Sequence, residues 1–217
     1  MANLLDSIKE YVTPELISQA AKSLSENEGG ISKAIGGLAP TILAGFLNKT
    51  GDAETMSNIF NKLSNFNPDS LDDLAGLIGG GNLAHGDPKD AAGQILGLVF
   101  GAKIPAITNA VAAFSGAKAS SVSTLLGMVG PLVIGILSKK ISASGLNANG
   151  FTNLLVKEKN SILGALPSGM ASILNLAELG GDSGDGAEAA TGARWLWPLL
   201  LLLGLGGGII FYLRSCF

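Results

Sequence analysis

The residue types that carry most catalysis and metal binding are scarce in this chain of 217 residues. It has one histidine, His85, and one cysteine, Cys216, so a paired-histidine metal site and a disulfide within the chain are both excluded. His85 stands two residues before Asp87, a pair that could share a proton, but no nucleophile or second base lies at a suitable spacing. We therefore predict no catalytic residue, no metal site and no cofactor, and we interpret His85 as an exposed loop residue.

Three further segments resemble chemical sites but lack an essential part. The loop GGGNLAHG at residues 79–86 is rich in glycine, yet it lacks the lysine of a phosphate-binding P-loop. The carboxylates within 182–188 miss the ligand spacing of a calcium-binding loop, and those within 69–73 suit the first turn of a helix. We interpret the first two segments as linkers and the third as the start of a short helix.

The charge balance excludes nucleic acid as a partner. The net charge is −3 and the pI is near 5.1, whereas a protein that neutralises phosphates needs a basic stripe. The lysines are scattered, and only Lys139 and Lys140 are adjacent. The same balance argues against a soluble part that rests on an anionic membrane surface.

Residues 195–213 form a run of nineteen residues without a charge. At a rise of about 1.5 Å per residue, a helix of this length covers roughly 30 Å, which is the thickness of the hydrocarbon core of a bilayer. We predict a single transmembrane helix at residues 194–214, with the lipid bilayer as its partner. The residues assigned to its two membrane interfaces are Trp195, Trp197, Tyr212, Arg194 and Arg214.

The first residues, MANLLDSIKEYV, have neither the basic start nor the continuous apolar run of a signal peptide. Because Arg194 and Arg214 cancel in the positive-inside comparison, the missing signal decides the orientation. We expect a single-pass membrane protein whose N-terminal domain lies in the cytoplasm.

The rest of the chain has the pattern of helices, and no stretch alternates with the period of a strand. Apolar residues fall on one face of 4–12. Thr13 and Pro14 provide the N-cap and the first position of a second helix, which ends at ENEGG. A third helix is predicted from near Ile31 to about Thr50. We therefore predict an all-α fold.

The chain also contains an internal repeat. Placing Pro40 on Pro131 aligns AIGGLAPTILAGFLNK with LLGMVGPLVIGILSKK, and weaker matches precede and follow this block in the same order. We predict two related halves of three helices each, residues 1–86 and 87–179, followed by a flexible Gly/Asp/Ala linker at 180–193. Chance similarity between alanine- and glycine-rich helices is the alternative.

Glycines recur at every fourth position in two places. Gly93, Gly97 and Gly101 do so in the soluble part, and Gly204 and Gly208 do so in the predicted anchor. This spacing lets two helix backbones approach closely, so self-association is one interpretation of both sets. For the soluble set we favour helix packing within the chain, and for the anchor set the general abundance of glycine is an equal alternative.

Several middle segments, such as LLGMVGPLVIGIL at residues 125–137, are uncharged over about thirteen residues. Such a length is too short to span a bilayer, so we expect these segments to be buried core helices. A domain that inserts its apolar helices into the membrane, as colicins do, is the alternative.

Three blocks of the chain resemble bacterial family 937 of the domains of unknown function: LISQAAKSLSENEGGISKAIGGLAPTILAGF, DAAGQILGLVFGAK and SSVSTLLGMVGPLVIGILSKK. The resemblance spans roughly residues 4–178. It carries over no catalytic or binding residue, because none is established for the family. It also implies a context, since related proteins often continue from one transmembrane helix into a periplasmic OmpA-like domain that binds peptidoglycan, of which these residues contain no part.

Together these patterns predict a non-enzymatic protein of the bacterial envelope, anchored in the inner membrane. We expect it to form homo-oligomers and to act as a scaffold or structural element, which in a longer form would connect the inner membrane to the cell wall. A pore-forming or membrane-remodelling protein is the alternative, and an enzyme is disfavoured.

Overall fold

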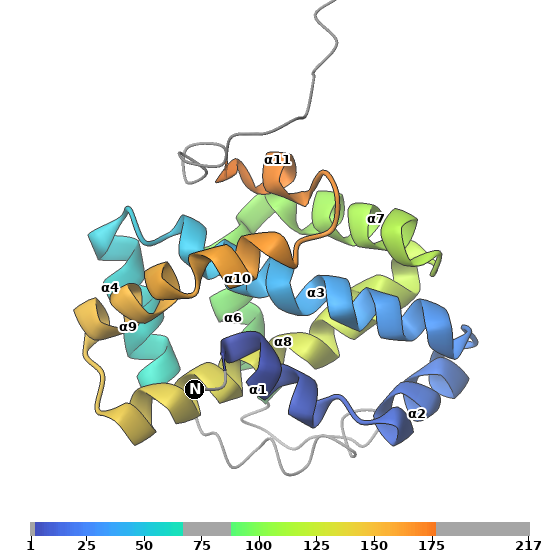
Figure 1. Ribbon diagram of the computed structural model, residues 1–217, viewed down its shortest axis with the longest axis horizontal. Helices are drawn as coiled ribbons and strands as arrows, with labels where there is room; N and C mark the ends of the chain where they lie inside the picture. Colours follow the sequence, from blue (N-terminus) through green and yellow to red (C-terminus); the bar gives the residue numbers. More distant parts are fainter. Residues whose placement is uncertain (1–2, 67–87, 177–217) are drawn as a thin grey trace, which may run out of the picture. The chain divides into compact units, whose positions relative to one another are not determined.

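The computed structural model of the chain describes residues 3–66 and 88–176. These two ranges contain α-helices and one short 3₁₀ helix, and they contain no β-strand, so the predicted all-α class is confirmed. Residues 1–180 group into one compact unit. The helices in chain order (Figure 1) are α1 (Leu4–Tyr11), α2 (Pro14–Leu24), α3 (Glu28–Asn48), α4 (Ala53–Ser64), α6 (Pro88–Phe100), η2 (Gly101–Lys103), α7 (Ile104–Ser115), α8 (Ala119–Ser144), α9 (Ala148–Lys157), α10 (Lys159–Gly164) and α11 (Met170–Leu174).

Side-chain caps explain where five of these helices begin. In each case an Asn, Thr or Asp side chain accepts a hydrogen bond from a backbone N–H two or three residues later, which satisfies one of the donors that a helix start leaves without a partner. The five caps are Asn3, Thr13, Asn27, Asp52 and Asn147. Thr13 caps α2 and Pro14 stands in its first turn, as predicted.

Helix α3 begins earlier than the sequence pattern indicated. The prediction placed its start near Ile31, because the two glycines of ENEGG were taken as the end of the preceding helix. In the structure the Asn27 side chain accepts the backbone N–H of Gly30, so the helix already begins at Glu28. One side-chain cap therefore outweighs the low helix propensity of the glycine pair.

The two longest helices, α3 and α8, form the centre of the unit (Figure 1). They contact each other, and α3 also contacts α1, α2, α6, α7, α9, α10 and α11. Each contains a buried proline, Pro40 or Pro131, as its thirteenth residue. A proline inside a helix removes one backbone hydrogen bond, and burial of apolar side chains on all sides of these two helices offsets that loss.

Helices of the two predicted halves interleave within this unit. Helix α4 of the first half packs on α8 of the second, and α9 of the second half packs on α3 of the first. The rings of Phe46 on α3 and Phe151 on α9 meet edge to face, with centroids 6.4 Å apart. Both halves therefore contribute to one shared hydrophobic core.

Three pairs of structural landmarks recur at a separation of 91 residues. Helices α2 and α7 each have a proline in the first turn and a left-handed residue directly after the last turn, and α3 and α8 each have an internal proline. The three pairs are Pro14 and Pro105, Ser25 and Gly116, and Pro40 and Pro131. Helices α2–α3 and α7–α8 thus share these features in the same order.

Three helical segments of the described residues are long and apolar enough to cross a membrane: Glu28–Asn48, Ala91–Ser115 and Ala119–Ser144. The expectation that the apolar segment of α8 is too short to span was wrong, because small polar residues extend that helix to 26 residues. The most apolar stretches of Glu28–Asn48 and Ala119–Ser144 are 83% and 72% buried, as core helices require. The corresponding stretch of Ala91–Ser115 is only 39% buried, so much of its apolar surface lies outside the core.

Candidate functional site

The exposed side of α6 and of the turn after it carries no charged residue. Its exposed positions are small or uncharged, and one of them, Leu98, is 39% exposed. We call these residues the α6 face: Ala91, Gly93, Gln94, Gly97, Leu98, Gly101 and Ala102. An exposed apolar surface that extends beyond a single side chain is typical of an interaction site.

Gly93, Gly97 and Gly101 belong to the α6 face, contrary to the packing within the chain that their spacing favoured. A Cβ atom at Gly93 or Gly97 would meet no described atom within 4 Å. Gly101 has a φ of +51°, which side chains rarely adopt, so its role is to let the chain turn between α6 and η2. These glycines therefore leave a smooth surface rather than an intramolecular helix crossing.

Close helix contacts occur instead at two glycines that the spacing argument did not single out. A Cβ atom at Gly45 of α3 would lie 2.5 Å from Cγ1 of Val99, and one at Gly130 of α8 would lie 2.7 Å from Cδ1 of Leu96. Both glycines thus admit the inner side of α6. The apolar spacing of Ile95, Leu96 and Val99 along α6 was the signal that marks this inner side.

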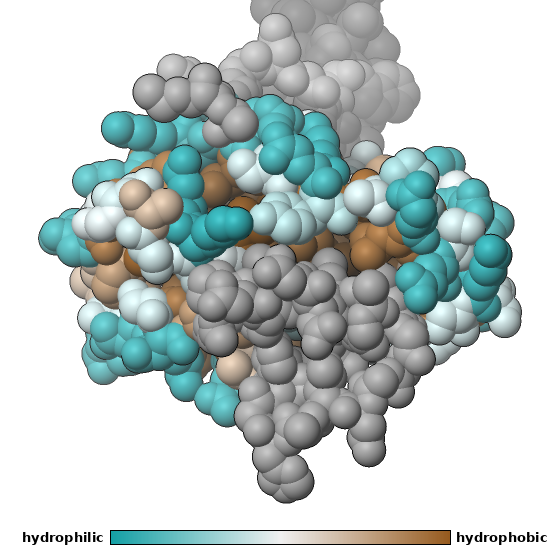
Figure 2. Space-filling model, turned by 90° about the horizontal axis from the view of Figure 1, so that it is seen from below, coloured by the Kyte–Doolittle hydropathy of each residue, from teal (hydrophilic) through white to brown (hydrophobic). Residues whose placement is uncertain are grey.

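Each proline-containing helix lines an apolar groove beside its internal proline. The first groove, of about 230 Å³, lies among α1, α2 and α3, and the second, of about 270 Å³, lies between α6 and α8. Gly36 and Pro40 line the first, and Gly127 and Pro131, which stand 91 residues later, line the second. The lower face of the molecule also shows hydrophobic residues at the surface between hydrophilic ones (Figure 2).

Each groove contains a backbone carbonyl without its usual helical partner. Proline has no backbone N–H, so the carbonyl four residues before it receives no helical hydrogen bond from that position. These carbonyls belong to Gly36 and Gly127, which are both exposed and have no described atom near a built Cβ. Each groove therefore combines apolar walls with an accessible hydrogen-bond acceptor, which suits an apolar group that bears an N–H or O–H.

Two lysines border the α6 face. Nζ of Lys62, on α4, donates a hydrogen bond to Oε1 of Gln94 at 2.9 Å, and Nζ of Lys103, in η2, donates to the carbonyl oxygen of Leu174 at 3.1 Å. No Asp or Glu occurs anywhere in residues 91–157. The α6 face and its border on η2 and α4 are therefore uncharged or positive.

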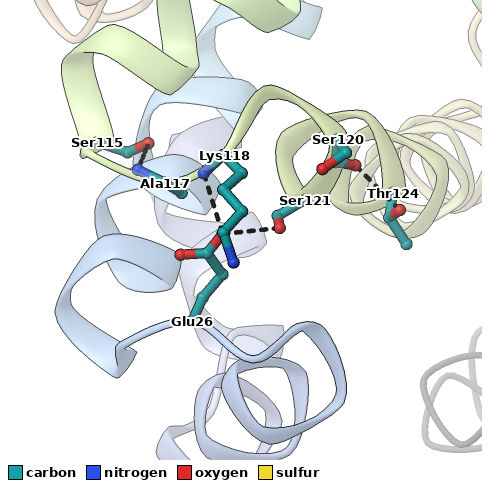
Figure 3. Close-up of polar contacts among 7 residues, drawn as sticks. All are labelled: Glu26, Ser115, Ala117, Lys118, Ser120, Ser121 and Thr124. Atoms are coloured by element: carbon teal, nitrogen blue, oxygen red, sulfur yellow. Dashed lines mark hydrogen bonds and ion pairs between the residues drawn. The ribbon is translucent and has the colours of Figure 1, made fainter.

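The carboxylate of Glu26 holds the start of α8 (Figure 3). It accepts hydrogen bonds from the backbone N–H of Lys118 at 3.0 Å and from Oγ of Ser121 at 2.8 Å, and its side chain is 8% exposed. The hydrogen bond from Lys118, followed by that from Ser121, lowers the pKa of Glu26 below its ordinary value of 4.5. Its partners are those of a helix cap, so we assign it a structural role.

The described residues contain no group of three or more His, Cys, Asp or Glu side chains that could hold a metal ion. Several residues singled out in the sequence lie outside the described ranges, and the structure says nothing of them. They are His85, Asp87 and Cys216, the anchor residues Arg194, Trp195, Trp197, Tyr212 and Arg214, and the anchor glycines Gly204 and Gly208.

A protein-family model described as "Bacterial protein of unknown function (DUF937)" matches residues 6–140. This match covers more than half of the chain. The chain belongs to the DUF937 family. The resemblance inferred from the three sequence blocks is thereby confirmed, although the match ends within α8 rather than near residue 178. Both proline-lined grooves, at Gly36–Pro40 and Gly127–Pro131, lie within the DUF937 match. No curated protein and no solved structure shows significant similarity to the chain.

Proposed function

We propose that this DUF937 protein is a non-enzymatic scaffold of the bacterial envelope. The observation that supports the proposal is the α6 face, an uncharged surface on a segment that is apolar enough to span a membrane and yet is only 39% buried. A surface of this kind suits contact with another extended surface rather than with a small substrate. The proposed role is therefore one of assembly and attachment.

The scaffold is held at the inner membrane by one transmembrane helix at residues 194–214, with the helical domain in the cytoplasm. Copies associate through the anchor glycines Gly204 and Gly208, whose four-residue spacing permits close approach of two helices in lipid. In a longer form of the protein, a periplasmic part would extend the attachment to the cell wall.

The helical domain consists of two duplicated halves in this proposal. The recurrence of three landmark pairs at one separation of 91 residues supports duplication, because chance similarity would not preserve both a helix end and two proline positions. The interleaved packing of α4 on α8 and α9 on α3 follows if two copies of a short helical unit first associated and were then joined.

Two measurements on membranes test the anchor and its orientation. The protein should stay with the membrane pellet after washing at alkaline pH, and alkaline phosphatase fused after Phe217 should be active because it reaches the periplasm. A fluorescent protein fused before Met1 should fold in the cytoplasm. Release of the protein by the alkaline wash, or an inactive phosphatase fusion, would refute the proposed topology.

A pore-forming or membrane-remodelling protein remains the second candidate, and one observation favours it. Three helical segments, Glu28–Asn48, Ala91–Ser115 and Ala119–Ser144, have the length and composition to cross a bilayer. Release of an entrapped dye from lipid vesicles distinguishes the two functions. The scaffold proposal predicts intact vesicles at protein concentrations that saturate binding, whereas leakage that rises with bound protein would favour the pore.

A further inference from the structure

The net charge of the chain conceals an uneven distribution of charge. Residues 91–176 contain six lysines and a single carboxylate, Glu158, whereas residues 3–66 contain five lysines and seven carboxylates. The argument from net charge against an anionic membrane surface therefore does not apply to α6 and the helices that follow it.

The α6 face combines the two features by which a protein surface binds an anionic bilayer. Its exposed apolar residue is Leu98, and its small neighbours, such as Gly97, leave no bulky side chain between the helix backbone and a flat surface. Lys62 and Lys103 stand at its border. Apolar contact together with lysines near the headgroups is the usual combination in interfacial helices.

The described chain ends beside the same face. The carbonyl oxygen of Leu174 accepts hydrogen bonds from Nζ of Lys103 and from Nδ2 of Asn48, so α11 ends next to η2. In the proposed topology the anchor begins at residue 194, which is 18 residues after Leu176. A flexible chain of that length spans roughly 25 Å. The border of the α6 face therefore stays near the bilayer in that topology.

We propose that the α6 face rests on the surface of a bilayer that contains anionic phospholipids. Leu98 enters the headgroup region, Lys62 and Lys103 lie beside lipid phosphates, and the groove between α6 and α8 is open to an acyl chain along Gly93 and Gly127. A second copy of the chain is a poorer fit, because a two-fold contact through this face would bring lysines of the two copies together. The inference rests on the proposed anchor and adds a lipid partner for the domain.

Site-specific labelling of the full chain in vesicles tests the proposal. The native cysteine is removed by Cys216→Ser, and a fluorophore is attached at Leu98→Cys or, as a matched control, at Val156→Cys. Val156 lies on α9 and is 50% exposed, so it is another apolar residue at the surface. A quencher attached to lipid headgroups should quench the label at position 98 at least several-fold more than the label at 156 in vesicles of equal parts phosphatidylcholine and phosphatidylglycerol.

Charge and lipid composition provide the decisive controls. Quenching at position 98 should fall by roughly fivefold with Lys62→Glu or with phosphatidylcholine alone, because one lysine near an anionic surface contributes about that factor. Lys22→Glu on α2, which is also exposed, should leave it unchanged. Equal quenching at both positions, or insensitivity to anionic lipid, would overturn the lipid face.

Two further outcomes separate the possible failures. If the label at position 98 is protected from water-soluble quenchers in proportion to protein density, and equally so in neutral vesicles, a second copy covers the face and the lipid proposal is refuted. If the protein does not float with the vesicles in a density gradient, the anchor of the proposed function has failed. If it floats but the label stays in water, only the lipid face has failed.

Discussion

Oγ of Ser121 lies 2.8 Å from Oε1 of Glu26, and this hydrogen bond joins the connection between α2 and α3 to the first turn of α8. The N-cap residue of α8 is Lys118, whose side chain makes no cap hydrogen bond. Glu26 provides the cap instead, across 92 residues of sequence, by accepting the backbone N–H of Lys118. One carboxylate therefore fixes the N-terminal end of α8 against the start of α3.

Replacement of this carboxylate should make the protein less stable at neutral pH and less sensitive to acid. The pKa of Glu26 is lowered in the folded state, so its contribution is present above the unfolded-state value near 4.5 and is lost as the pH falls through the lower folded-state pKa. Denaturant unfolding of Glu26→Gln and of the parent should differ at pH 7 and converge towards pH 3. Glu10→Gln, at an exposed position of α1, serves as control, and an equal loss of stability in both variants would contradict the assignment.

Alanine at two glycines should have opposite effects on stability. Gly45→Ala places a methyl group 2.5 Å from Cγ1 of buried Val99, and overpacking of this kind costs about 1–3 kcal/mol. Gly97→Ala lies in the helix interior with open space around the new methyl group, so it should stabilise by about 0.5–1 kcal/mol. Chemical denaturation measures both values. Destabilisation by Gly97→Ala would show that the α6 face packs within the chain after all.

The buried hydroxyl of Ser138 should contribute measurably to the contact between α8 and α4. Its Oγ donates a hydrogen bond to the carbonyl oxygen of Leu63, and the residue is 1% exposed. The backbone N–H of Phe66 also donates to that carbonyl, so Ser138→Ala should cost about 1 kcal/mol rather than the full penalty for an unsatisfied group. Exposed Ser123→Ala on the same helix is the control, and comparable losses in both variants would rule out a specific role for this bond.

Local signals in the sequence predicted most of the helices. The Thr13–Pro14 pair marks the start of α2 because a hydroxyl cap and a proline both suit a first helical turn. Continuous apolar residues around Pro40 and Pro131 predicted buried central helices, and the structure buries both. The start of α3 was missed because a cap by Asn27 was given less weight than two glycines.

The direction of the α6 face could not be read from glycine spacing, because the same four-residue period occurs whether a face packs inwards or outwards. The buried residues Ile95, Leu96 and Val99 on the opposite side contain the missing information. Contacts between distant residues, such as Glu26 with Ser121, depend on how the helices assemble. No local pattern announces such contacts, so the structure was required to find them.

Self-association through the membrane anchor is the central claim, and the mass of the detergent-extracted particle tests it most directly. Mass photometry should show a particle of discrete size, larger than the 21.9 kDa chain together with its detergent. The double variant Gly204→Leu/Gly208→Leu should dissociate it, whereas Gly206→Leu, on another side of the helix, should not. Monomers of the parent protein, or assemblies that the double variant leaves intact, would contradict the account.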